Sequence, residues 1–430
     1  MFFNRRNFLL FFGASFLASL VGGINFSAKL VNAEDNNNSG AEGNNNINNN
    51  LNNVESEKIP DNNLIDWFKL NPETEKDWKM LTDSNNPLEF KLVENSQEKQ
   101  GLKKKIFVMF PRQSSAYNTA MSTILDLFHN KKIPAVFTVV NFEQKMELGE
   151  KALALAKAEK FDLIFAMGSE SADFLYNNFK IMQPNKAIPV VSVCAKDPVI
   201  LGQMKDYEKG SNSNIAFTSL NVPVEVQMAY LKKLKPSLMN IAVMYDKQNK
   251  SAIETQFKPL ITVAEKYNIN IIEVAVNQET AREDLQQEIP VAIEKIIKTD
   301  QNMKNSIFWI TGSTSVFQEI STINQLTDRI PVLSVVPDVV KAGENSAILA
   351  IGVSFESNAY LAALYGTDIL QGKSQVDQLP VGIVSPPDIA INFRKSRAIG
   401  LKIPFNFFES ASYVYDAKGI LVRDRGKTVS

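Results

Sequence analysis

Short, unbroken apolar runs alternate with amphipathic stretches along most of this chain from Lys105 onward, and this alternation constrains the fold more than any other feature. Runs of this kind are typical of strands that are buried on both faces in parallel sheets flanked by helices. A repeated strand–helix order predicts a doubly wound α/β architecture. The apolar runs are Ile106–Phe110, Ala135–Val140, Leu163–Met167, Ile188–Val193, Ile241–Tyr245, Ile271–Val276, Ser306–Ile310 and Pro331–Val335.

The chain has more strands than one domain of this kind usually holds, and the alternation of strands and helices is interrupted halfway along the chain. Residues 211–214 (Ser-Asn-Ser-Asn) read as a turn that leads into a crossing strand at Ile215–Leu220. We therefore predict two doubly wound parallel-sheet lobes joined by a hinge. Lobe 1 is expected over residues 104–218 plus 352–385, and lobe 2 over residues 219–351 plus 386–404.

The two ends of the chain are patterned differently from this body. Residues 1–33 carry Arg5 and Arg6, then an apolar run, then small residues before Ala33, which is the pattern of a cleavable export signal. The sequence Asn4–Leu9 resembles a twin-arginine motif, and a general secretory signal is the alternative. Residues 34–60 are asparagine-rich and are expected to form a disordered linker.

Two further segments flank the main fold. Residues 61–103 are expected to be a short N-terminal extension, whose apolar residues allow one or two short amphipathic helices docked on the main fold. Residues 405–430 form a tail whose pattern over 413–422 predicts a terminal hairpin. We expect the exported protein to be periplasmic, with cleavage after Ala33.

Composition excludes several function classes. The chain has 430 residues and a formal net charge of −1, which argues against nucleic-acid binding. Its one cysteine, Cys194, and one histidine, His129, exclude a disulfide framework and cysteine- or histidine-rich metal sites. No dinucleotide fingerprint, nucleophile elbow or calcium loop is present. The sequence thus predicts neither metal nor cofactor, and binding rather than enzymatic catalysis.

The two halves of the body echo each other in the loops that follow their strands. Each half has a polar loop with serine after its first strand, at 111–115 and 246–251. Each also has a strand that ends in small hydroxyl residues, at 168–171 and 311–315. Ligands of open α/β sheets bind outside the carboxyl ends of the strands. If the lobes face each other, these loops line one cleft.

Several segments in order resemble the ABC-transporter periplasmic substrate-binding proteins, in the branch that includes tryptophan- and tyrosine-binding members. The resemblance rests on Asp162–Ser169, Ile188–Val191, Lys196–Val199, Tyr245–Ser251 and Ile391–Pro404, and covers roughly residues 104–404. It implies a type I periplasmic binding fold. It also implies a small-molecule ligand held between the lobes and delivery to ABC permease subunits, after export by the twin-arginine or general secretory machinery.

Candidate ligand contacts follow from the loops and from this resemblance. Exposed helix N-termini with hydroxyl side chains bind carboxylates, although the same residues are also the commonest N-caps. Asp197, in the family's Asp-Pro position, is the expected partner of a ligand ammonium, and Asp338 lies in a loop similar to the family's ligand loop; each is also readable as a turn or cap. Tyr117 is a candidate for packing on the ligand. The hydroxyl candidates are Ser114, Ser115, Ser169, Ser251, Ser313 and Thr314.

The sequence departs from the family pattern in several ligand loops, so the resemblance does not identify the ligand. Glu170 stands where the family has a small residue, and within the cleft it would favour a cationic or polyamine-like ligand. Thr311–Ser315 replaces a family segment that carries an acidic residue. The favoured ligand is an amino acid or related zwitterion. The alternatives are a sugar- or nucleoside-binding protein, a sensory periplasmic protein, and an exported enzyme.

Overall fold

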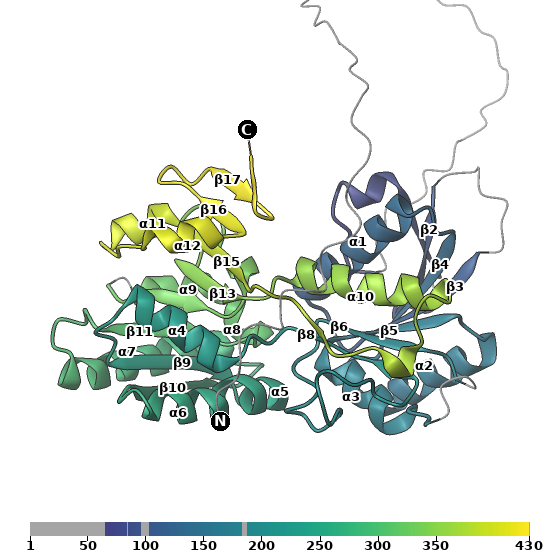
Figure 1. The fold of residues 1–430 in the computed structure, drawn as a ribbon, viewed down its shortest axis with the longest axis horizontal. Coiled ribbons are helices and arrows are strands. Elements are labelled where there is room, and N and C mark those ends of the chain that lie inside the picture. The colour runs from purple at the N-terminus through teal and green to yellow at the C-terminus, as the bar shows by residue number, and fades with distance from the viewer. Residues whose placement is uncertain (1–64, 84, 96–102, 183–186, 328, 430) are drawn as a thin grey trace, which may run out of the picture. The chain divides into compact units, whose positions relative to one another are not determined.

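The computed structural model describes residues 65–83, 85–95, 103–182, 187–327 and 329–429. The export signal and the asparagine-rich linker predicted for residues 1–60 lie outside these residues. The described chain contains two large sheets, each flanked by helices, and one small two-stranded sheet (Figure 1). This is the predicted two-lobed α/β architecture. Among the described helices, none is both long and apolar enough to cross a membrane.

The sheet of lobe 1 has seven strands in the order β1-β2-β4-β3-β5-β6-β7. The strands from β4 to β7 run parallel, as their unbroken apolar sequences predict. Helices α1 (Ser115–Asn130), α2 (Met146–Glu159), α3 (Gly168–Asn178) and α10 (Phe355–Leu370) belong to this lobe. The strands are β1 (Trp78–Thr82), β2 (Glu89–Glu94), β3 (Lys104–Phe110), β4 (Ala135–Asn141), β5 (Leu163–Met167), β6 (Val190–Val193) and β7 (Ile215–Ala216).

The segment before Lys104 forms an antiparallel hairpin rather than the docked amphipathic helices that its sequence allows. Strand β2 pairs with β4 and extends the sheet of lobe 1, and β1 pairs with β2. The helical interpretation was wrong because the decisive period is two: Phe90 and Leu92 are buried while Lys91 between them is exposed. Of the segment upstream, only a short 3₁₀ turn, η1 (Thr74–Lys76), is helical in the described residues.

An aromatic cluster fixes this N-terminal segment to lobe 1. The rings of Trp67 and Phe68 lie 5.2 and 4.7 Å from that of Phe90, and both also pack on Phe110 at the end of β3. Each such pair contributes about 0.5–1.5 kcal/mol beyond the burial of its area. The segment is therefore an integral part of the lobe 1 core.

The sheet of lobe 2 has nine strands in the order β10-β9-β11-β12-β13-β15-β16-β17-β18. Strands β10 to β13 run parallel, β15 is antiparallel to β13, and β16 is parallel to β15. The strands are β9 (Asn240–Asp246), β10 (Asn270–Val276), β11 (Ser306–Ile310), β12 (Val332–Ser334), β13 (Leu349–Gly352), β15 (Asp388–Asn392), β16 (Tyr413–Tyr415), β17 (Leu421–Asp424) and β18 (Lys427–Thr428).

Helices flank this second sheet as well, and the tail of the chain adds strands to its edge. Strands β16 and β17 form an antiparallel pair, so residues 413–428 continue the lobe 2 sheet. The helices are α4 (Val224–Leu234), α5 (Lys250–Ala252), the π-helical turn η3 (Ile253–Phe257), α6 (Lys258–Glu265), α7 (Ala281–Thr299), α8 (Thr314–Phe317), α9 (Ile320–Leu326), η4 (Pro337–Val339), α11 (Phe393–Ala398) and α12 (Phe405–Ser410).

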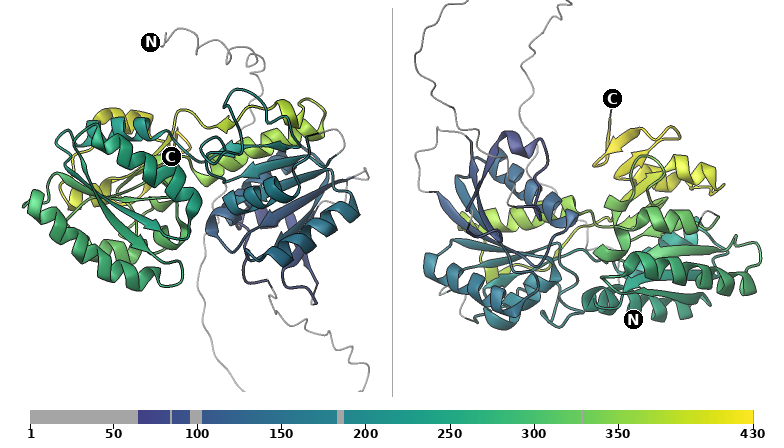
Figure 2. Two further views of the ribbon diagram at one scale, coloured as in Figure 1. Left: turned by 90° about the horizontal axis from the view of Figure 1, so that it is seen from below. Right: turned by 180° about the vertical axis from the view of Figure 1, so that it is seen from behind.

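Within the described residues the chain crosses between the lobes after β8 (Thr218–Ser219), after β13 and after β14 (Gly382–Ile383). Strands β8 and β14 pair with each other, and η5 (Val376–Gln378) precedes β14. Helix α10 returns to lobe 1 and packs along α1, so chain segments far apart in sequence lie together there (Figures 1 and 2). These crossings form the connection at which one lobe can rotate against the other.

Candidate functional site

The site lies where the carboxyl ends of the strands of both sheets meet. Lobe 1 contributes the loops after β3, β5 and β6, and lobe 2 contributes those after β9 and β11. The two lobes enclose a cavity that we call the central cavity. It is lined by Arg112, Ala116, Tyr117, Ser169, Glu170, Cys194 and Lys196 of lobe 1, by Leu220 and Phe355 at the crossings, and by Asn249, Ser251, Gly312, Thr314 and Phe317 of lobe 2.

The central cavity is nearly filled by its own side chains. Its volume is about 30 Å³, roughly that of one water molecule in the liquid. A more open space of about 420 Å³, here called the outer cavity, adjoins it and shares Arg112, Ser169, Glu170, Asn249 and Ser251 with it. A ligand larger than water therefore enters the central cavity only if side chains or lobes move apart.

The structure brings together half of the residues singled out from the sequence. Tyr117, Ser169, Glu170, Ser251 and Thr314 line the central cavity. Ser115 and Asp338 line a different space of about 790 Å³, which lies beside the tail strands β16 and β17.

Ser114, Ser313 and Asp197 line none of these three cavities. Ser114 is the N-cap of α1, and its hydroxyl accepts a hydrogen bond from the Ala116 N–H at 3.3 Å. Ser313 is fully buried, and its hydroxyl contacts that of Thr311 and accepts from the Asn249 amide at 3.4 Å. Both serines therefore hold the loops rather than face the cavity.

The Asp197 carboxylate is used within its own loop. One oxygen accepts from the backbone N–H groups of Val199 and Ile200 at 2.8 and 3.1 Å. The other accepts from the Tyr207 hydroxyl at 2.7 Å. These contacts are those of an Asp-Pro turn that ends a strand, which was the alternative interpretation of the sequence.

Asp338 also has a local role in the structure. Its carboxylate accepts from the backbone N–H of Phe355 at 3.1 Å, at the start of α10, and so links a loop of lobe 2 to a helix of lobe 1. Burial raises the pKa of Asp338 to about 7. The carboxylate thus supports the crossing after β13.

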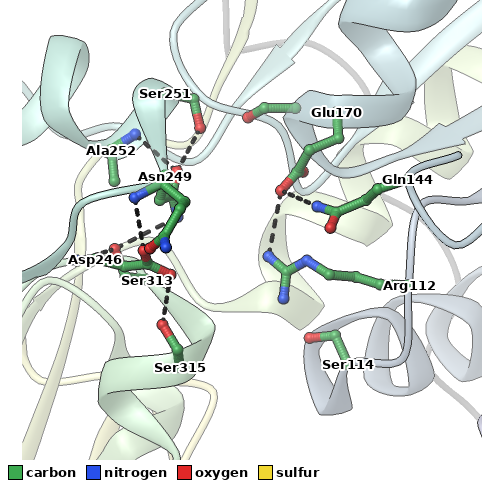
Figure 3. A network of polar contacts seen from close by, with 12 residues as sticks. Arg112, Ser114, Gln144, Glu170, Asp246, Asn249, Ser251, Ala252, Ser313 and Ser315 are labelled. Atoms are coloured by element: carbon green, nitrogen blue, oxygen red, sulfur yellow. Dashed lines mark hydrogen bonds and ion pairs between the residues drawn. The ribbon is translucent and has the colours of Figure 1, made fainter. Parts of the chain in front are cut away.

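Glu170 faces the central cavity, but its carboxylate already has partners. The Arg112 guanidinium donates to it at 3.2 Å and the Gln144 amide at 3.5 Å (Figure 3). Burial together with this nearby carboxylate raises the pKa of the Tyr117 hydroxyl. The negative charge of Glu170 is therefore compensated by the Arg112 guanidinium, within lobe 1.

Lys196 is the main residue that the sequence reasoning missed. It lies in the loop after β6, which ends at Val193, and the residue is only 7% exposed. It reaches lobe 2: a methyl group added at Gly312 would lie 2.1 Å from its Nζ atom. No hydrogen bond or ion pair of this ammonium exists among the described residues. Burial lowers the pKa of Lys196 to about 8, and the nearby Glu170 carboxylate limits the shift.

The lobe 2 wall is built of neutral groups held by a hydrogen-bond network (Figure 3). The Asn249 side-chain oxygen accepts from the Ala252 N–H at 3.0 Å and from the Ser251 hydroxyl at 2.9 Å, which caps α5. The Gln256 amide oxygen accepts from the Gly312 N–H at 2.7 Å. Asp246, in the outer cavity, accepts from the Ser315 hydroxyl at 2.7 Å.

The described part of the chain contains no group of three or more His, Cys, Asp or Glu side chains that could hold a metal ion. The single histidine lies in lobe 1, 2.8 Å from Glu94 on β2, and does not line the central cavity. The arrangement therefore offers charged and polar groups for recognition.

Comparison with known proteins assigns the class. The family model described as "ABC transporter substrate binding protein" matches residues 128–414. The chain therefore belongs to this family, whose members are solute-binding proteins and are typically extracytoplasmic. The family implies a small-molecule ligand and ABC permease partners. None of the curated proteins matches the chain.

Solved structures share the type I fold at low sequence identity. A conserved domain protein of Vibrio cholerae O1 biovar El Tor is 19% identical, with a TM-score of 0.58 over 73% of this chain and 100% of that one. The ligand-free, open form of CD0873, a substrate-binding protein with adhesive properties from Clostridium difficile, is 22% identical, with a TM-score of 0.53 over 73% and 99%. An ABC domain in complex with L-Trp from Streptococcus pneumonia is 16% identical, with a TM-score of 0.56 over 72% and 100%.

Proposed function

We propose that this protein is an exported solute-binding protein that captures an amino acid or a related zwitterion between its lobes and delivers it to an ABC permease. The observation that carries the proposal is the central cavity, where charged groups of lobe 1 meet polar groups of lobe 2 in this family's fold. Lys196 supplies an ammonium without a partner in the described part of the chain, and the buried Asp246 carboxylate lines the adjoining outer cavity. A zwitterion presents charges complementary to this set.

Closure of the lobes is the proposed capture step. Hinge motion around a bound ligand is the usual mechanism of two-lobed binding proteins. The small volume of the central cavity supports this step, because a ligand would have to enter while the lobes are apart. The closed form would then be the one that the permease recognises.

Export through residues 1–33, with cleavage after Ala33, belongs to the same proposal. Its support is the basic, apolar and small-residue pattern of the sequence together with the family's typical location outside the cytoplasm. The asparagine-rich residues 34–60 would act as a tether. The twin-arginine route is favoured by Arg5 and Arg6 over the general secretory route.

A sugar- or nucleoside-binding protein is the alternative, and its support is that Tyr117, Phe317 and Phe355 line the central cavity. Phe317 packs on Phe355, with ring centroids 6.0 Å apart, and Tyr117 packs on Phe110 at 5.8 Å. These ring contacts would have to be exchanged for contacts with the ligand ring, whereas Lys196 has no partner among the described residues to give up.

A thermal-shift screen tests the proposed function. The purified protein is heated with amino acids, polyamines, sugars and nucleosides, and the bound compound is then recovered and weighed by mass spectrometry. A ligand at a thousand times its Kd adds about 4 kcal/mol to the free energy of unfolding, which is a clear shift. We expect an amino acid to stabilise the protein and to be recovered unchanged. A chemically altered compound would instead indicate an enzyme.

A further inference from the structure

The Lys196 ammonium has no hydrogen-bond or ion-pair partner among the described residues. Lys196 is only 7% exposed, and its ammonium lies against the backbone of Gly312 across the central cavity. The Nζ atom is not one of the described buried polar atoms that lack a partner, so it keeps contact with solvent at the cavity. A cation without a protein partner that faces a cavity is placed to receive an anionic group of a ligand.

The nearest carboxylate does not pair with this ammonium. Glu170 already receives hydrogen bonds from Arg112 and Gln144, both within lobe 1. The groups that face Lys196 from lobe 2 are uncharged, namely Gly312, Gln256, Asn249 and Thr314. From lobe 1, Cys194 lies beside it, with its thiol kept protonated because burial raises its pKa.

A second donor without a protein partner lines the same cavity. The Nε atom of Arg112 is buried and has no hydrogen-bond partner, although the other end of this guanidinium binds Glu170. Buried polar atoms without partners are rare in folded proteins. Lobe 1 therefore presents two cationic groups with unused hydrogen-bond donors at this cavity, the Lys196 ammonium and the Arg112 guanidinium.

We propose that Lys196 and Arg112 form a carboxylate-binding subsite in the central cavity, so that the ligand must carry an acid group. This inference rests on the proposed function and narrows it. Polyamines carry no acceptor for these donors, and sugars and nucleosides offer only neutral acceptors, which make weaker bonds to two cations than a carboxylate does. Glu170 acts as the positioning residue that orients Arg112, which reverses the sequence-based expectation that this carboxylate attracts a cationic ligand.

Gly312 places the backbone of lobe 2 next to the Lys196 ammonium of lobe 1. The lysine Nζ occupies the place that a side chain at residue 312 would take, since an added methyl group would lie 2.1 Å from it and would displace the ammonium. The Gly312 N–H is held by Gln256, which fixes this backbone in place. A carboxylate bound to Lys196 would therefore sit at the contact between the lobes.

The test uses pairs of compounds that differ only in the acid group. Each L-amino acid that stabilises the protein is compared with its amide and with its decarboxylated amine by titration calorimetry. The variants are Lys196→Met, Lys196→Arg and, as matched control, Lys395→Met. Lys395 is also partly buried with its pKa lowered to about 8, but it bonds to backbone carbonyls of Glu344 and Ser346 in lobe 2.

We expect wild-type protein to bind the acid but neither the amide nor the amine. Lys196→Met should weaken binding by at least about 30-fold, the loss typical of a truncated buried ion pair, and Lys196→Arg should retain more of it. Without ligand, Lys196→Met should melt at a temperature no lower than that of wild type, because it removes a largely desolvated cation that has no partner in the described part of the chain. The Lys395→Met control should keep wild-type affinity.

The outcomes separate this inference from the proposed function. Equal binding of acid and amide, wild-type affinity in Lys196→Met, or capture of a sugar, nucleoside, polyamine or phosphomonoester in place of a carboxylate would overturn the carboxylate subsite while solute binding stands. If no compound of any class binds, both the subsite and the proposed function fail.

Discussion

The two walls of the central cavity differ in charge although the two lobes share one architecture. Lobe 1 contributes Arg112, Glu170 and Lys196, and lobe 2 contributes Asn249, Ser251, Gly312 and Thr314. The lobe 1 wall leaves donors without partners, whereas the polar groups of lobe 2 bond mainly to one another. The comparison indicates a division of labour in which lobe 1 selects the ligand by charge and lobe 2 closes over it.

The largest expected effect is on the pH dependence of binding. Because the pKa of Lys196 is lowered to about 8, the ammonium that holds a carboxylate is lost as the pH rises through that value. Affinity should fall by about tenfold per pH unit above pH 8. Calorimetry from pH 6 to 10 on wild type and Lys196→Met with the same amino acid measures the effect, because titration of the ligand's own ammonium is common to both proteins. A flat profile would place the ligand away from lobe 1.

The same titration changes stability in the opposite direction. In the unfolded chain a lysine has its ordinary pKa near 10.4, so between about pH 8 and that value the unfolded state binds more protons than the folded state. The contribution of Lys196 to the free energy of unfolding therefore rises with pH across this window. Lys196→Met should abolish this component in ligand-free protein.

The next largest effect is expected from Arg112→Met. It removes one unsatisfied donor and leaves the Glu170 carboxylate without its ion pair. Because the two side chains are 19% and 32% exposed, solvent screening reduces the cost, and we expect about 1–3 kcal/mol of lost binding and stability. Arg282→Met is the matched control, since it breaks an exposed Arg–Glu pair of lobe 2. Equal behaviour of the two variants would contradict the charged role of lobe 1.

Gly312→Ala tests the contact between Lys196 and the uncharged lobe 2 side of the central cavity. The added methyl group would displace the Lys196 ammonium or push the loop after β11 outward. Overpacking of this kind costs about 1–3 kcal/mol, and less where a flexible side chain can yield. We expect weaker ligand binding with little change in ligand-free melting temperature. A fall in melting temperature with intact affinity would show that Gly312 serves packing alone.

The smallest effect on binding is expected from Asp197→Ala. The lost carboxylate holds two backbone N–H groups and the Tyr207 hydroxyl, so stability should fall by about 1–2 kcal/mol. Affinity should change much less than in Lys196→Met. Melting curves and calorimetric titrations of this variant are compared with those of wild type. A loss of affinity without a loss of stability would show that Asp197 contacts the ligand.

The sequence predicted the parts of the molecule whose physical signal is periodic. The buried parallel strands, their order with helices and the meeting of the loops at one edge followed from apolar runs such as Leu163–Met167. The N-terminal hairpin was missed because only Phe90 and Leu92 carry its alternation, in a segment otherwise rich in polar residues.

The site was harder to predict because hydroxyl and acidic residues cap helices as readily as they bind ligands. From the sequence, Ser114 and Asp197 are candidate ligand contacts. The structure shows that their side chains accept hydrogen bonds from nearby backbone N–H groups. Lys196 left one signal, a charged residue in the short loop after a buried strand. Its burial depends on Gly312, which lies more than a hundred residues away in sequence and in the other lobe.

The capture of an acid ligand between the lobes is tested most directly by the melting temperatures of wild type and Lys196→Met measured side by side. Each protein is heated with the twenty L-amino acids together, and separately with a mixture of hexoses, nucleosides and polyamines. The account predicts that the amino acids raise the melting temperature of wild type but not that of Lys196→Met, and that the second mixture has no effect. An unchanged melting temperature of wild type with the amino acids, or stabilisation by the second mixture, would contradict it.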